Sequence, residues 1–186
     1  MNKKLVTGIF AFTVLAGTGV GYRLYYGNAV FHFSDQSIVL YDRAKHRKSI
    51  DRIFNEDFHT LTANPDHSMD LMLEKRSPNR YEQKYFGKMD TVVLLEVGQV
   101  AGFISYFMRN NYEGKILFLA IDSQFRRKGY ARRLAQHGID ELKKQGAKFV
   151  VLHTRVENNK AQQLYESMGF VRKYEENGFF FYRKEL

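Results

Sequence analysis

The 186-residue sequence predicts an α/β domain with mixed strands and helices, preceded by an N-terminal hydrophobic segment. Residues 36–186 carry short β-rich runs that alternate with apolar stripes of helical spacing. The composition, 44% hydrophobic and 15% aromatic, is sufficient for one packed core. Because no internal repeat or low-complexity tract divides the chain, we expect one domain at residues 36–186, with residues 1–35 as an anchor and linker.

The N-terminal appendage is set apart by a stretch without charge. Leu5 to Tyr22 are eighteen uncharged residues, close to the minimum length of a helix that spans a bilayer. A cleaved secretory signal ending near Ala16 and a buried helix of the domain are alternatives. Four glycines in the stretch disfavour a soluble helix, and no small-residue cleavage site precedes a polar start. We therefore expect a single-pass membrane anchor, with Arg23 and nearby tyrosines at the membrane surface.

The first half of the domain predicts a strand, a helix and a hairpin. The run SIVLYD, residues 37–42, has strand character, and residues 43–61 carry apolar residues with helical spacing. Residues 91–109 read as a hairpin turning around Gly98 and Gln99. The run KILFLAI, residues 115–121, is apolar on both faces, as expected of a central strand covered on both sides.

The second half predicts two helices, a strand and a final hairpin. A helix follows the basic stretch and ends near Gly146. Its expected buried stripe is Tyr130, Leu134, Ala135, Ile139 and Leu142. The run KFVVLH, residues 148–153, is another strand, and a short helix lies between Asn158 and Gly169. The tail forms a hairpin that turns at Asn177-Gly178.

Charge and cysteine content limit the possible functions. The chain has no cysteine, which excludes disulfides, zinc–thiolate sites and any acyl-enzyme on a thiol. A formal net charge of +9 favours polyanionic partners such as nucleic acid, anionic lipid or a phosphorylated ligand. Charge alone does not choose among these three.

The stretch Arg126-Arg127-Lys128-Gly129-Tyr130-Ala131, between an apolar strand and a helix, has the properties of a phosphate site. Free N–H groups at a helix start point outward, and the helix dipole favours an anion there. Gly129 lets the backbone approach a phosphate, and Ala131 keeps the helix start narrow. A solvated helix start would instead favour acidic residues in its first turn. The stretch lacks the features of a Walker loop and of a dinucleotide fingerprint.

Two motifs together indicate a family. Arg126-x-x-Gly129-x-Ala131 is followed by Asn158-x-x-Ala161-x-x-Leu164-Tyr165-x-x-x-Gly169-Phe170. In this order the motifs resemble the GCN5-related N-acetyltransferases (GNAT), and among them the ribosomal-protein N-terminal acetyltransferase type. The resemblance covers about residues 37–186 and is strongest over 116–170. It implies a mixed, mostly antiparallel sheet splayed into a V and flanked by helices, with acetyl-coenzyme A in the cleft and no metal.

The resemblance also implies the contacts of the co-substrate. Backbone groups of residues 119–121 would pair with the pantetheine arm and the acetyl carbonyl, while amides of residues 127–132 would hold the pyrophosphate. Asn158 would reach the cofactor from the next helix, although it is equally typical of a helix N-cap, worth about 1 kcal/mol. The expected cofactor-binding residues are Leu119, Ala120, Ile121, Arg126, Arg127, Lys128, Gly129, Tyr130, Ala131, Arg132 and Asn158.

Tyr165 and His153 are the candidate catalytic residues. Tyr165 matches the position of the family's general acid, which protonates the departing coenzyme A thiolate. Its alternative is a core aromatic residue with one hydrogen-bond partner. His153 stands where the N-terminal acetyltransferase type carries a glutamate base; histidine can take a proton near neutral pH. A strand histidine is also often structural, and the departure from glutamate leaves specificity for N-terminal amines open.

The sequence therefore predicts an acetyltransferase that transfers an acetyl group directly from acetyl-coenzyme A to a primary amine in a ternary complex. The alternatives are a basic nucleic-acid-binding module and a non-catalytic acetyl-coenzyme A-binding domain; no nucleic acid is expected. Because acetyl-coenzyme A is a cytosolic metabolite, we expect the domain on the cytoplasmic side of the membrane. The acceptor, a peptide N-terminus, lysine, polyamine or amino sugar, stays open, and loops around residues 64–85 and 110–114 are expected to shape its site.

Overall fold

The computed structural model describes residues 23–26, 29–32, 36–62 and 89–186. The expected hydrophobic span at residues 5–22 and the expected acceptor loop at 64–85 lie outside these ranges. Among the residues that are described, no helix is long and apolar enough to cross a membrane. Predictions about the anchor therefore stay predictions.

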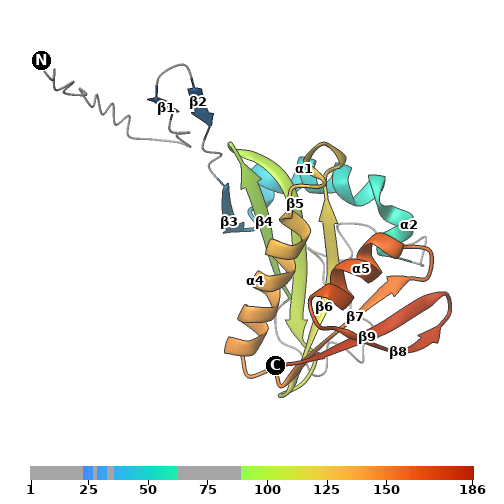
Figure 1. Cartoon of the computed structure of the whole chain (residues 1–186). Coiled ribbons are helices and arrows are strands. Elements are labelled where there is room, and N and C mark those ends of the chain that lie inside the picture. Colours follow the sequence, from blue (N-terminus) through green and yellow to red (C-terminus); the bar gives the residue numbers. More distant parts are fainter. Residues whose placement is uncertain (1–22, 27–28, 33–35, 63–88) are drawn as a thin grey trace, which may run out of the picture.

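The domain is built on a seven-stranded sheet in the order β3-β4-β5-β6-β7-β9-β8 (Figure 1). Its strands are β3 (Gln36–Leu40), β4 (Asp90–Glu96), β5 (Gln99–Met108), β6 (Glu113–Ile121), β7 (Phe149–Arg155), β8 (Val171–Glu176) and β9 (Phe179–Glu185). The helices are α1 (Arg43–Glu56), α2 (Phe58–Leu61), α4 (Tyr130–Lys144) and α5 (Asn159–Ser167), with a 3₁₀ turn, η2 (Ser123–Phe125). Among the strands that the structure describes, only the β6–β7 pair is parallel, which confirms a mixed, mostly antiparallel sheet.

Three local predictions need correction. The helix expected over residues 43–61 breaks at Asp57, whose carboxylate pairs with Arg126 instead of continuing the helical surface. The β4–β5 turn is formed by Val97 and Gly98, both at positive φ, one residue earlier than predicted. Where only a linker was expected, β1 (Arg23–Tyr26) and β2 (Ala29–His32) form a separate antiparallel hairpin.

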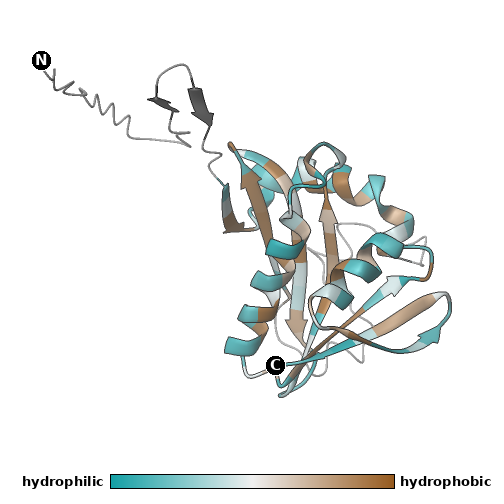
Figure 2. Ribbon diagram, in the orientation of Figure 1, coloured by the Kyte–Doolittle hydropathy of each residue, from teal (hydrophilic) through white to brown (hydrophobic). Residues whose placement is uncertain are grey.

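Helices cover both faces of the sheet (Figure 1). On one face, α4 and α5 enclose a core with Ile104, Ile116 and Leu152. On the other face, α1 packs against Phe103 and Phe118. Hydrophobic residues concentrate in the central strands, and the outward turns of α4 are hydrophilic (Figure 2). The predicted apolar stripe of α4 is confirmed, because all of its residues are buried: Tyr130, Leu134, Ala135, Ile139 and Leu142.

Strand β6 changes its role halfway along its length. Its first residues, Glu113–Lys115, pair with β7, and beyond them the two strands diverge (Figure 1). A β-bulge follows: Ile116 faces Tyr106 and Phe118 faces Ser105, which leaves Leu117 without an opposite residue. Leu117 and Phe118 consequently both pack on the α1 side of the sheet. The divergence of β6 and β7 gives the sheet the V shape that the resemblance implied.

Substituting alanine for Gly102 should destabilise the domain, because β5 and β6 approach closely there. A Cβ atom at Gly102 would lie 2.5 Å from Ile121 Cδ1 and 2.6 Å from the Ala120 carbonyl oxygen. Because the carbonyl belongs to the backbone, β6 itself must move, and we expect a loss of about 2 kcal/mol in the free energy of unfolding. Urea denaturation of Gly102→Ala measures the loss. An unchanged midpoint would mean that β5 and β6 separate here without cost.

Candidate active site

A slot opens where β6 and β7 diverge. It runs through the sheet from the α2 side to the α5 side, because both helices contribute side chains to its wall. Its lining residues are Thr60, Leu61, Ile116, Leu117, Leu119, Leu152, His153, Thr154, Asn158, Ala161 and Tyr165. The slot thus brings together both candidate catalytic residues, Asn158 and part of the strand expected to hold the pantetheine arm. The turn at residues 110–114 lies at the other end of β6, beside the start of β7, and does not line the slot; its part in the acceptor site stays a prediction.

The second half of β6 presents a free backbone edge to this slot. The Asp122 N–H donates to the Ala101 carbonyl oxygen at 3.0 Å, which fixes the phase of the β5–β6 ladder. Backbone groups alternate in direction along a strand, so those of Ala120 face β5, whereas those of Leu119 and Ile121 point away from β5, on the side where Leu119 lines the slot. The Ile121 carbonyl oxygen accepts from Arg126 Nε at 2.9 Å. The Leu119 N–H and C=O and the Ile121 N–H therefore point where an extended ligand could pair.

Tyr165 lies on α5 with its ring packed against Phe170 and Tyr182, at centroid distances of 5.7 and 6.3 Å. The side chain is 7% exposed, and no residue of the described ranges forms a hydrogen bond with its hydroxyl. Burial raises the pKa of the hydroxyl above its ordinary value, so the group stays protonated across the physiological range. Tyr165 thus belongs to the core through its ring and also lines the slot, while its role as general acid stays a prediction.

His153 and Asn158 line the same slot from β7 and from the start of α5. His153 is exposed, and its ring lies 5.0 Å from that of Phe181. The Asn158 side-chain oxygen accepts from the Ala161 N–H at 3.1 Å, which confirms the helix N-cap. Its contact with a cofactor stays a prediction. Within the ranges that the structure covers, no group of three or more His, Asp or Glu residues could hold a metal ion.

The N-terminus of α4 has the geometry of an anion site. No side chain caps it, and its first turn contains no acidic residue. The first helical bond runs from Arg133 N–H to the Gly129 carbonyl oxygen at 3.1 Å, so the amides of residues 130–132 precede the helical ladder. Gly129 and Arg127 adopt positive φ values of 80° and 68°, which turn the preceding loop toward the helix start. A Cβ atom on Gly129 would meet no protein atom within 4 Å, so the space in front of it is open.

Side chains of the basic stretch are mostly occupied within the protein. Arg126 contacts Asp57, and Lys128 contacts Glu96 at 3.0 Å. Arg132 donates to Ser167 Oγ at 2.6 Å, whereas Arg127 has no partner among the described residues. The side chain of Tyr130 is buried, so only its backbone can face the loop. The structure therefore leaves the backbone amides, with Arg127, as the means of holding a phosphate.

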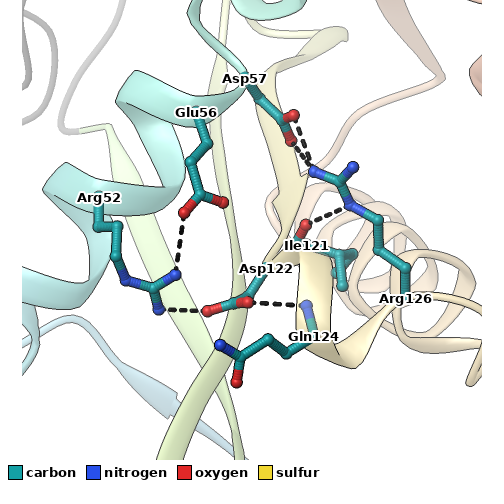
Figure 3. Close-up of polar contacts among 7 residues, drawn as sticks. All are labelled: Arg52, Glu56, Asp57, Ile121, Asp122, Gln124 and Arg126. Atoms are coloured by element: carbon teal, nitrogen blue, oxygen red, sulfur yellow. Dashed lines mark hydrogen bonds and ion pairs between the residues drawn. The ribbon is translucent and has the colours of Figure 1, made fainter.

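Figure 3 shows a polar network that the sequence did not reveal. Asp122, directly after β6, accepts from the Arg52 guanidinium and from the Gln124 N–H at 3.0 Å. Arg52 also pairs with Glu56 at 3.1 Å. These two residues are four positions apart, a spacing at which side chains of a helix are neighbours, so this pair can be predicted from the sequence. The pairing of Arg52 with Asp122 joins residues 70 positions apart, and no local pattern predicts it.

Stability at acid pH should depend on Asp122. Burial alone would raise the pKa of this carboxyl, but hydrogen bonds from Arg52 and from the Gln124 N–H outweigh burial and hold the pKa below its ordinary value of 3.8. The resulting stabilisation is present above pH 3.8 and is lost as pH falls through the lowered pKa. Asp122→Asn should lose about 2 kcal/mol near pH 7, and the difference from wild type should shrink below pH 4. Urea titrations between pH 2.5 and 7 test this; a constant difference would contradict it.

Several solved structures share this architecture. Ard1 from Thermoplasma volcanium superposes with a TM-score of 0.63 at 22% identity, covering 81% of this chain and 97% of that one. The NatC complex bound to Gag peptide and CoA gives 0.61 at 24% identity, over 81% and 98%. The PaiA N-acetyltransferase of Thermoplasma acidophilum, in complex with coenzyme A, gives 0.64 at 15%, over 82% and 99%. At these identities the likeness shows the fold.

Curated relatives match a shorter part of the sequence. N-alpha-acetyltransferase 30 of Schizosaccharomyces pombe is 42% identical over 59 residues, which are 32% of this chain and 39% of the relative. The ribosomal protein bS18-alanine N-acetyltransferase of Escherichia coli is 41% identical over 58 residues, 31% and 39% of the two chains. The matches thus span less than half of these relatives.

The sequence profile of the acetyltransferase (GNAT) family matches residues 47–170, well over half of the chain. This range contains the slot, the uncapped start of α4 and α5 with Tyr165. Profile, fold and paired motifs agree. The chain belongs to the acetyltransferase (GNAT) family.

Proposed function

We propose that this protein transfers the acetyl group of acetyl-coenzyme A directly to a primary amine, with peptide or protein N-termini as the first acceptors to test. The proposal rests on one observation: Tyr165 lines a slot whose other wall is the edge of β6 that is not paired with β7. The nearby α4 N-terminus, uncapped and without acids, suits a pyrophosphate. The names of the relatives, which describe acetyl transfer to protein N-termini, support this acceptor class.

Acetyl-coenzyme A, when bound, supplies an acyl group activated as a thioester. The chain's own residues position this group and manage charge and protons. The N–H groups of Leu119 and Ile121 face the slot, where they could stabilise an oxyanion as the C–N bond forms. The protonated Tyr165 hydroxyl could give its proton to the sulfur as the C–S bond breaks. His153, exposed on the same slot, could take the proton of the attacking amine, directly or through water.

The proposal is tested by coenzyme A binding and by a panel of acceptors. Calorimetry with coenzyme A should show binding by the wild-type protein, and its absence would overturn the proposal. Mass spectrometry should then show acetylation of at least one peptide with a free N-terminus. The peptides tested include one that begins with alanine. A peptide with a blocked N-terminus and internal lysine, a polyamine and an amino sugar complete the panel. Binding without any acetylation would favour the non-catalytic alternative, whereas salt-sensitive RNA or DNA binding without coenzyme A binding would favour the nucleic-acid module.

We also propose that residues 5–22 tether the protein to a membrane with the domain on the cytoplasmic side. The support is the sequence alone, an uncharged stretch long enough to span. Full-length protein should sediment with membranes and a chain starting at Gln36 should not, while protease added to intact cells should leave the domain uncut. Recovery of the full-length protein in the supernatant would refute the tether. Sequencing of the mature N-terminus separates an anchor from a cleaved signal.

A further inference from the structure

We infer that Arg126 and Arg155 are positioning residues that hold α2 across the open end of the slot, so that the expected phosphate-binding loop also fixes one wall of the acceptor site. The inference rests on the proposed function and extends it. We call Asp57, Arg126 and Arg155 the α2 clamp. If the α2 clamp holds the wall of the slot, the affinity for the acceptor depends on the Asp57 carboxylate, although Asp57 touches neither the co-substrate nor the reacting atoms.

The short helix α2 needs external support. It contains four residues, Phe58–Leu61, too few for a helix to be stable on its own. Thr60 and Leu61 line the slot, so the position of α2 sets the width of the slot on that side. Phe58 and Leu61 pack against the core on the α1 side, Phe58 edge-on to Phe54 at a centroid distance of 5.9 Å, and polar contacts hold the two ends of α2. Those contacts come from the loop that follows β6 and from the end of β7.

Arg126 fixes the beginning of α2. Its Nη2 donates to both carboxylate oxygens of Asp57, at 2.8 and 2.9 Å, and its Nε donates to the Ile121 carbonyl oxygen at 2.9 Å (Figure 3). Asp57 is the junction residue between α1 and α2. One guanidinium group therefore joins the end of β6, the loop before α4 and the start of α2. A charged group with three accepting atoms in reach is more fixed than an isolated surface pair.

Arg155 fixes the other end of α2. It lies at the end of β7, and its Nε and Nη2 donate to the carbonyl oxygens of His59 and Thr62 at 2.9 and 3.3 Å. These carbonyls lie at the C-terminal end of α2, where the helix dipole favours a cation. The guanidinium also lies 4.4 Å from the ring centroid of Phe179, which limits its rotation. As a result, α2 bridges β6 and β7 where the sheet no longer connects them.

The competing explanation is that the Arg126 side chain serves the co-substrate and Asp57 is only its counter-ion. The variant Asp57→Asn separates the two, because Asp57 lies outside the loop. Glu96→Gln is the matched control: it removes a carboxylate that pairs with Lys128 of the same loop, but Glu96 lies on β4 and not at α2. Both changes remove one negative charge next to one cation of the loop.

The experiment uses the wild-type protein, Asp57→Asn, Arg155→Gln and Glu96→Gln, with the peptide of the panel that wild type acetylates fastest. We expect KM for the peptide to rise about tenfold in Asp57→Asn and Arg155→Gln, with kcat and the coenzyme A dissociation constant within about twofold. Glu96→Gln should leave the peptide KM unchanged. Amide hydrogen exchange at residues 58–62 should accelerate in the first two variants only.

Each outcome decides one question. A peptide KM that changes equally in Asp57→Asn and Glu96→Gln refutes the clamp, and so does a loss of coenzyme A affinity in Asp57→Asn at constant peptide KM. Unchanged exchange at residues 58–62 in Asp57→Asn refutes it even if the wild type acetylates no peptide. A wild-type protein that acetylates nothing refutes the proposed function by a separate measurement.

Discussion

Replacing Tyr165 with phenylalanine should lower kcat about a hundredfold and leave the coenzyme A dissociation constant nearly unchanged. The change removes one oxygen atom and keeps the ring that packs against Phe170 and Tyr182. Because burial raises the pKa of the hydroxyl, wild type keeps its proton donor at high pH, and kcat should not decline through loss of this proton as pH approaches 10. Steady-state kinetics from pH 6 to 10, with calorimetry of coenzyme A, measure both effects.

Tyr182→Phe is the matched control for this change. It also removes one buried tyrosine hydroxyl, but that hydroxyl contacts Glu166 and Arg172 and not the slot. The control should lose some stability, about 1 kcal/mol for the hydrogen bonds, and keep its kcat. If Tyr165→Phe kept full activity on every active acceptor of the panel, the proton would come from another group. Equal losses of kcat in both variants would point to a disturbed core.

Replacing Gly129 with valine should weaken coenzyme A binding by at least about tenfold, because each lost charge-assisted contact is worth roughly 1.5–3 kcal/mol. Two effects combine. Gly129 has a φ of 80°, which valine adopts only with strain, and its added side chain would extend into the open space in front of the uncapped amides. Calorimetry of folded protein measures the affinity, and urea denaturation records the strain separately.

Gly178→Val controls for the backbone strain. Gly178 has a φ of 76° in the β8–β9 turn, and a Cβ atom there also meets nothing within 4 Å. Both variants should therefore lose a similar free energy of unfolding, on the order of 1–2 kcal/mol, while only Gly129→Val loses coenzyme A affinity. Equal affinity in the two variants would place the phosphates away from the start of α4.

The parts of the fold that were predicted correctly depend on neighbours in the sequence. The apolar stripe of α4, the Asn158 cap and the Asn177-Gly178 turn each follow from residues within a few positions of one another. The break in the first helix could not be predicted in this way. The break falls at Asp57, whose carboxylate pairs with Arg126, 69 positions away in the sequence.

The candidate site divides along the same line. Tyr165 and Gly129 could be singled out because each lies within a motif of fixed spacing, and the edge of β6 because this strand directly precedes the first motif. The α2 wall and the contacts of Arg155 could not, since carbonyl acceptors carry no signature in the side-chain sequence. The ion pairs of Arg126 and Lys128 could not be predicted either, because their partners Asp57 and Glu96 lie far away in the sequence.

The bulge at Leu117 makes β6 two strands with independent tasks. Residues before it complete the sheet with β7, and residues after it offer hydrogen-bonding groups to a guest. The extra residue shifts the alternation of the strand by one position. Ile116 and Ile121, on the two sides of the bulge, therefore both pack into the core on the α5 side. The direction in which the backbone groups of residues 119–121 point is therefore set by the register after the bulge, and not by the pairing of β6 with β7.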